Sequence, residues 1–190
     1  MAQNRTAVLE DVVILPASWR NFAGERRKYN PQGSRNFNIK LNKEQYDAML
    51  ADEWPVRVRE SKDEFDEPLY FMQCKLYFHR DPDTGVETSR GPKVKVITSN
   101  GIKDFDNHMV KELDNAEIRS ADIMVRQSPW QDDGETRYSA YCNELWVTIE
   151  ESFLERKYGR CEGDECEVGM PVSGLKLGGS GTDLPPWKED

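Results

Sequence analysis

The sequence predicts a mainly β fold, either a small β-barrel or a strongly curved sheet, with a few short helices and a disordered acidic C-terminal tail. Segments that alternate apolar and polar residues outnumber those with helical spacing. The chain is 190 residues long, which suits one domain and an appendage, and it shows no internal repeat. Its last 32 residues hold seven of the 13 glycines and few large apolar side chains.

The first half of the chain predicts three strands and one helix. A valine-rich run over 8–15 predicts a strand, which Pro16 ends. Alternation predicts further strands over 37–41 and 56–59. Asn42 and Gln45 have the spacing of a capping box and predict the start of a helix that runs to about Glu53.

The second half predicts four strands. The strand over 69–78 has an apolar face at its even positions, which include Cys74, and a mixed face at its odd positions. Further strands are expected over 94–98, 118–127 and 138–150, and Cys142 is expected on one face with Tyr138 and Trp146. A polar loop over 132–134 joins the last two strands. Short helices are expected after Asp106 or Asn107 and over 153–158. Many short strands with few helices favour an OB-like β-barrel.

The domain organisation follows from composition. Residues 1–158 form the predicted OB-like domain, and residues 159–190 form a flexible, Gly-rich acidic tail. Such a tail buries too little apolar surface to offset its ordering entropy. At its tip, a Trp on a glycine tether has no packing role in the domain and is typical of a peptide that enters a partner's pocket. The expected partner-binding residues are Asp183, Leu184, Pro185, Pro186 and Trp187.

The net charge is −9, which by itself argues against a nucleic-acid partner. The charge is sorted into blocks, however. The tail carries −4, residues 19–40 carry +5, and residues 60–67 hold five acids and one lysine. Because salt screens charges beyond about 10 Å, each block matters more to a partner than the sum does.

Several function classes find no support in the sequence. It has no apolar segment long enough to cross a bilayer and no signal peptide, so a cytoplasmic protein is expected, in the host cytoplasm if a phage encodes it. Catalytic and phosphate-binding motifs are missing, which indicates a protein that is not an enzyme and needs no cofactor. Cys161 and Cys166 lack further ligands for a zinc site, so no metal is expected either.

One group of residues does indicate a function: in the loop over 19–37, cations alternate with aromatic residues. Cations neutralise a phosphate backbone and flat rings stack on bases of any sequence, which is how proteins bind single strands. The same residues also fit a solvated loop whose Phe22 and Phe37 belong to the core. Composition leaves both interpretations open.

Two stretches resemble a group of bacteriophage proteins. Residues 20–37 match the pattern Asn-Phe-Ser-Gly, then Phe/Tyr-Asn-x-x-Gly-x-Arg-Asn-Phe, with Ala23 in place of Ser. The second stretch includes Asp122-Ile-Met-Val-Arg126, Pro129-Trp130 and Leu145–Glu151. The group, which is similar over about residues 10–158, looks like OB-fold single-stranded DNA-binding proteins of tailed phages.

The resemblance implies a protein that coats single-stranded DNA without strong sequence preference, in phage DNA replication or recombination. It leaves open whether the chain forms a homo-oligomer. The main alternative is a non-enzymatic phage structural or assembly protein, and a weaker one is a nuclease or other metal-dependent enzyme that uses scattered carboxylates. The expected phosphate contacts are Arg20, Arg26, Arg27, Lys28, Arg35, Lys75, Lys93, Lys95 and Arg126, and the expected base-stacking residues are Trp19, Tyr29, Tyr77 and Trp130.

The tail is similar to that of bacterial single-stranded DNA-binding proteins, in which an acidic run precedes a terminal Ile-Pro-Phe. Here three residues follow Trp187 and only Asp183 precedes the apolar group, so the tail departs from that pattern. We therefore expect it to recruit a phage replication or recombination protein.

Overall fold

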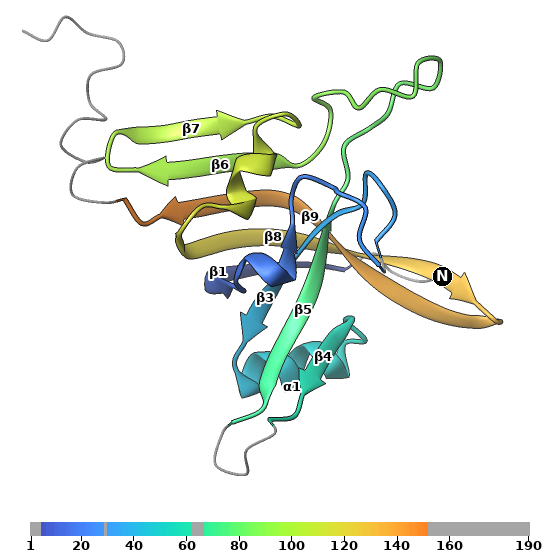
Figure 1. Ribbon diagram of the computed structural model, residues 1–190. Helices are drawn as coiled ribbons and strands as arrows, with labels where there is room; N and C mark the ends of the chain where they lie inside the picture. The colour runs from blue at the N-terminus through green and yellow to red at the C-terminus, as the bar shows by residue number, and fades with distance from the viewer. Residues whose placement is uncertain (1–4, 29, 62–66, 152–190) are drawn as a thin grey trace, which may run out of the picture.

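The computed structural model describes residues 5–28, 30–61 and 67–151, and these residues are mainly β (Figure 1). This confirms the predicted fold class. The elements are β1 (Thr6–Ile14), η1 (Ala17–Trp19), β2 (Arg20–Asn21), β3 (Arg35–Leu41), α1 (Lys43–Ala51), β4 (Val56–Arg59), β5 (Leu69–Leu76), β6 (Lys93–Thr98), β7 (Gly101–Phe105), η2 (Val110–Asp114), β8 (Ile118–Asp132) and β9 (Glu135–Ile149). Residues 153–158 and the tail lie outside the described residues.

Five strands form a ring in the order β5-β3-β1-β8-β9. The ring returns to β5 through a short parallel contact, in which Cys74 pairs with Ala140 and Lys75 with Tyr141. A ring of five strands is the arrangement expected for an OB-type fold. In Figure 1, β6 and β7 continue the sheet beyond β9, and α1 and β4 lie at the opposite end of the molecule.

The inside of the ring is the hydrophobic core. Phe22 and Phe37 are fully buried and stack with their ring centroids 5.1 Å apart, which settles their role as core residues. Met72, Cys74 and Leu76 on the even positions of β5 are also buried, as the alternation predicts. The outward face of β5 therefore carries its odd positions, among them Lys75.

Helix α1 begins as predicted. The Asn42 side chain accepts a hydrogen bond from the Gln45 backbone N–H (2.7 Å), and Gln45 Oε1 accepts one from the Asn42 N–H (3.0 Å). Just past its C-terminal end, the buried Gln127 amide donates to the carbonyls of Asp52 and Glu53 (3.2 and 2.8 Å). These bonds attach the helix to β8.

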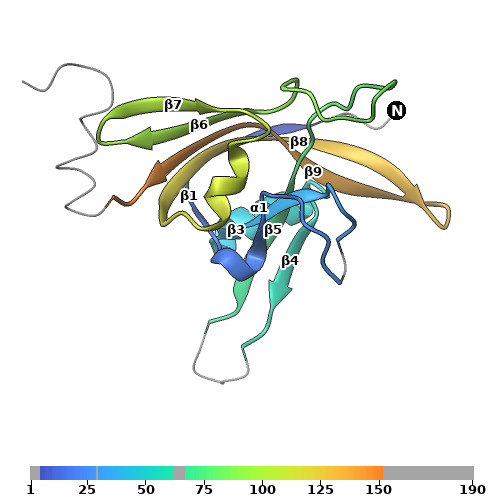
Figure 2. The same cartoon turned by 45° about the horizontal axis from the view of Figure 1, so that its top comes forward.

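Strands β7, β8 and β9 and the 3₁₀ segment η2 differ from the sequence-based expectation. Strands β8 and β9 run on into one long hairpin, which projects beyond the ring (Figure 2) and turns at Asp133 and Gly134. Both turn residues have positive φ (48° and 86°), as a two-residue type I′ turn requires. Strand β7 was not predicted, because its apolar residues Ile102 and Phe105 do not alternate with polar residues at period 2. The helix after Asp106 is a 3₁₀ segment, η2.

A β-bulge at Asn143 changes which residues of β9 face outward. Met124 pairs with Glu144 but Val125 pairs with Cys142, so Asn143 is the extra residue. Cys142 and Leu145 are consequently both buried, although they are three positions apart and regular alternation would place them on opposite faces. Cys142 therefore does not share a face with Trp146, which corrects the sequence-based expectation. The bulge places Tyr141, Glu144 and Trp146 together on the outer face.

Candidate nucleic-acid interface

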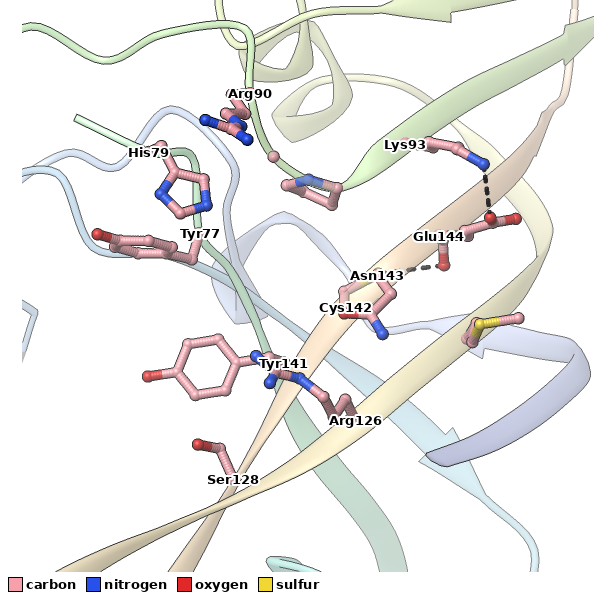
Figure 3. A pocket seen from close by; sticks show the side chains of 13 residues that line it. Tyr77, His79, Arg90, Lys93, Arg126, Ser128, Tyr141, Cys142, Asn143 and Glu144 are labelled. Atoms are coloured by element: carbon pink, nitrogen blue, oxygen red, sulfur yellow. Dashed lines mark hydrogen bonds and ion pairs between the residues drawn. The ribbon is translucent and has the colours of Figure 1, made fainter. Parts of the chain in front are cut away.

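A groove of about 650 Å³ lies on the outer face where β6, β8 and β9 meet the segment that follows β5. Figure 3 shows Tyr77, Tyr141 and Arg126 grouped on one side of it and Lys93 with Glu144 on the other. The groove brings together three residues predicted to bind DNA, Tyr77, Lys93 and Arg126. Its remaining lining residues are His79, Arg90, Gly91, Pro92, Met124, Ser128, Tyr141, Cys142, Asn143 and Glu144.

Cations outnumber acids in the groove. Arg90, Lys93 and Arg126 face one carboxylate, that of Glu144. Lys93 Nζ lies 3.1 Å from Glu144 Oε1, and this hydrogen bond and the lysine charge lower the pKa of Glu144. Arg126 is exposed, lies opposite Tyr141 in the β8–β9 ladder, and makes no ion pair with any residue that the structure describes. Its guanidinium is therefore available to an anion.

Aromatic rings with adjacent lysines line the same outer face. Lys75 Nζ lies 5.7 Å from the centroid of the Tyr141 ring and donates to Ser139 Oγ at 3.0 Å. Lys95 Nζ lies 5.1 Å from the Trp146 ring and pairs with Asp104 at 3.0 Å. Lys75 and Lys95 were predicted to bind DNA, whereas Tyr141 and Trp146 were missed. Alternation along 135–141 could have indicated Tyr141, but the bulge that turns Trp146 outward has no sequence signal.

Two predicted stacking residues are well exposed on this face. Tyr77 is 56% exposed, and its ring meets His79 edge-on at 5.5 Å. Trp130 is 46% exposed, pairs with Arg137 across the ladder, and lies four residues beyond Arg126 on the same face of β8. Trp130 therefore extends the aromatic face towards the tip of the β8–β9 hairpin.

The basic loop between β2 and β3 presents its cations to solvent. Arg26, Arg27 and Lys28 are all exposed. Asn21 fixes the base of the loop, because its side chain bonds both the N–H and the carbonyl of Glu25 (2.9 Å each). Tyr29 lies outside the described residues.

Comparison with protein families identifies the group. The family model of a putative phage ssDNA-binding domain matches residues 1–172. The chain belongs to this family. The match extends past residue 158, which composition predicts to be the end of the folded domain.

Solved structures similar to this phage ssDNA-binding domain include two phage proteins. The single-stranded DNA-binding protein from bacteriophage Enc34 has a TM-score of 0.45 and 6% identity, over 77% of this chain and 82% of that chain. The same protein in complex with ssDNA has a TM-score of 0.42 and 8% identity, over 77% and 88%. The single-stranded DNA-binding protein gp2.5 of bacteriophage T7 has a TM-score of 0.42 and 11% identity, over 80% and 90%. No curated protein matches the sequence.

Two arginines predicted to contact DNA support the fold of this domain instead. Arg20 is only 7% exposed, and its guanidinium donates to the carbonyls of Leu15 (2.6 Å), Leu113 (3.1 Å) and Ala116 (2.9 Å). The Arg35 side chain is 12% exposed; it pairs with Glu87 at 2.8 Å and donates to the Phe22 carbonyl at 2.7 Å. Because these guanidinium groups are used within the fold, we remove Arg20 and Arg35 from the candidate interface.

The remaining sequence-based expectations concern the tail, metals and membranes. Asp183, Leu184, Pro185, Pro186 and Trp187 lie outside the described residues. Within residues 5–28, 30–61 and 67–151, no three His, Cys, Asp or Glu side chains are placed to hold a metal ion. No helix in this part of the chain is long and apolar enough to span a membrane.

Proposed function

We propose that this chain binds single-stranded DNA, without strong sequence preference, in the outer-face groove. The observation that carries the proposal is the exposed Arg126 guanidinium, which makes no ion pair within the described residues and shares the groove with the exposed Tyr77 and the half-buried Tyr141. Proteins that bind single strands combine cations along the backbone with rings on which bases stack, and each stacked base contributes about 1–3 kcal/mol. Membership of the phage ssDNA-binding family supports the same conclusion.

The positions of cations and rings around the groove are a second support. OB folds bind oligonucleotides on the face of their second and third strands and with the loops after the first and fourth strands. In the ring, β3 and β5 are the second and third strands, and Lys75 lies on their outer face. The loop after β1 carries Arg26 and Arg27, and the turn after β8 lies near Trp130.

We assign roles by chemistry. Tyr77, Trp130, Tyr141 and Trp146 provide flat surfaces for bases, together with Tyr29. The cations that neutralise phosphates are Arg26, Arg27, Lys28, Lys75, Lys93, Lys95 and Arg126.

We further propose that the protein acts in phage DNA replication or recombination and that its tail recruits a partner. The proposal for the tail rests on its composition, in which Leu184 and Trp187 stand among acids after a glycine-rich stretch. An apolar anchor with charged flanks suits a pocket with a basic rim.

Titration with oligo-dT at low and high salt tests DNA binding. The intrinsic Trp fluorescence should be quenched, and log K should fall by about 0.7 per contacted phosphate for each decade of salt. Arg126→Gln should bind more weakly than Lys103→Gln, which removes a cation from an exposed position of β7 outside the groove.

The other outcomes separate the alternatives. Failure of the wild-type chain to bind at low salt would contradict the proposal and favour a structural or assembly role. Cleavage of the oligonucleotide on addition of Mg²⁺ would favour a nuclease.

A further inference from the structure

A second group of cations and aromatic rings lies on the outer face of β4 and β5, away from the groove residues. Building on the proposed function, we propose that Arg57, Arg59 and Trp19 form a second contact site for the same DNA strand. Lys75 lies between this site and the groove. None of these residues lines the groove, and neither Arg57 nor Arg59 was recognised from the sequence.

Strand register places the two arginines on the outer face. Arg57 pairs with Phe71 and Arg59 with Leu69, both at odd positions of β5. Residues that pair directly point to the same side of a sheet, and the buried Met72 and Cys74 mark the opposite side as the core. Since a strand rises about 3.3 Å per residue, Phe71 lies roughly 20 Å along β5 from Tyr77.

Trp19 and Arg59 form a cation–π pair, which we call the platform. The Trp19 ring packs edge-on against Phe71 with the centroids 5.1 Å apart, and this contact explains why Phe71 is buried on an outward position. The Arg59 guanidinium lies 5.7 Å from the centroid of Trp19. The Asn38 side chain donates to the Trp19 carbonyl at 2.8 Å and fixes η1 above β3. An arginine plane supported by an aromatic ring is a surface on which an unpaired base stacks.

Lys75 connects the platform to the groove. Burial lowers the pKa of Lys75, and the charge of Arg57 lowers it further. Arg57 is exposed and makes no ion pair within the described part of the chain. Neither of these two like charges forms an ion pair within the described residues, and a phosphate is an anion that would relieve their repulsion. Lys75 also lies over Tyr141, which lines the groove.

The acidic segment that follows β4 limits how far bound DNA can extend beyond the platform. Residues 60–67, which connect β4 to β5, carry five acids and one lysine. Glu60, the exposed residue that follows Arg59, begins this acidic run, and because carboxylates repel a phosphate backbone we expect the bound DNA to end near Arg59. The bound length should therefore be limited to the distance between the groove and this platform.

The test compares short and long oligo-dT on the double variant R57Q/R59Q. Binding sites of OB folds range from about 4 to about 16 nucleotides, so lengths near these limits are suitable. With the long oligonucleotide, the variant should bind more weakly than K103Q, and its salt slope should be shallower by at least about 0.7, the share of the phosphate that Arg57 contacts. With the short oligonucleotide, the double variant and K103Q should bind equally.

Equal affinity and equal slope for R57Q/R59Q and K103Q on the long oligonucleotide would overturn the second site. An equal loss on both lengths would also overturn it, because the arginines would then belong to the groove. If the wild-type chain binds neither length, the proposed function itself fails. Should the double variant unfold at a lower temperature, R57Q alone keeps the test valid, since it should change the slope by about 0.7.

Discussion

At the scale of single residues, burial separates arginines that the sequence cannot distinguish. Arg20 and Arg126 are each followed by a polar residue and each lie near an aromatic residue in the sequence. Arg20 is buried and donates to three backbone carbonyls, whereas Arg126 is exposed beside Tyr141. Long-range contacts with Leu113 and Ala116 decide the role of Arg20, and these contacts exist only in the folded chain.

The ring of Tyr141 should contribute more to DNA affinity than its hydroxyl does. Tyr141→Leu removes the flat surface under a base, and we expect about a tenfold loss of affinity for oligo-dT, since stacking is worth about 1–3 kcal/mol. Tyr141→Phe keeps the ring and should bind within about twofold of the wild type. Competition titrations at one salt concentration measure both variants. A similar loss in both would show that the hydroxyl, and not the ring, makes the contact.

At the scale of elements, Glu87 joins two loops. Its carboxylate pairs with Arg35 of β3 (2.8 Å) and with Arg80 (3.4 Å), and its backbone carbonyl accepts from Asn107 (3.2 Å). The Glu87 side chain is only 17% exposed. Arg35 also donates to the Phe22 carbonyl, so the start of the loop that carries Arg26–Lys28 is linked through Arg35 to residues 79–90, and Arg90 from this second segment lines the groove.

Removing the Glu87 charge should weaken DNA binding, although electrostatics alone predicts the opposite. Glu87→Gln leaves the half-buried Arg35 guanidinium without its anion, and a broken pair of this kind lets the two loops separate. Glu144→Gln is the matched control, because it also removes one acid but frees Lys93 at the groove and should strengthen binding. Titrations of both variants at low salt measure the difference. Stronger binding by Glu87→Gln would show that the loops need no such support.

The elements also show where sequence reasoning succeeds. Period-2 alternation located β3, β4, β5 and β6, and the Asn42 capping box located α1, because these signals are local. The Asn143 bulge and the contact between Lys75 and Tyr141 depend on how distant strands pair. Because alternation was continued through the bulge, Cys142 was predicted to share a face with Trp146. The same error prevented the recognition of Trp146 as an outward-facing residue.

At the scale of the whole molecule, the charge is arranged in space as well as in sequence. The groove carries Arg90, Lys93 and Arg126 although the chain has a net charge of −9. Closure of the ring through β5 and β9 brings Lys75 to the edge of this groove from a strand more than 60 positions away from Tyr141. The local surplus of cations, rather than the net charge, then determines what binds there.

The tail should reduce DNA affinity through its charge. Deletion of residues 178–190 removes three acids and one lysine, which changes the net charge from −9 to −7. If these acids compete with phosphates for the cationic face, the truncated chain should bind oligo-dT at least as tightly as the full chain at low salt. The difference should vanish at high salt, where the Debye length falls to about 3 Å at 1 M.

A full-length chain in which Asp183, Glu189 and Asp190 are replaced by their amides and Lys188 by Gln has the same net charge of −7 as the truncated chain, and it separates charge from length. It should match the truncated chain in affinity if the effect is electrostatic, and match the wild type if the length of the tail matters instead. Titrations of all three chains at two salt concentrations provide the comparison. A clear loss of affinity on deletion would mean that the tail contributes to DNA binding, and the competition would then be ruled out.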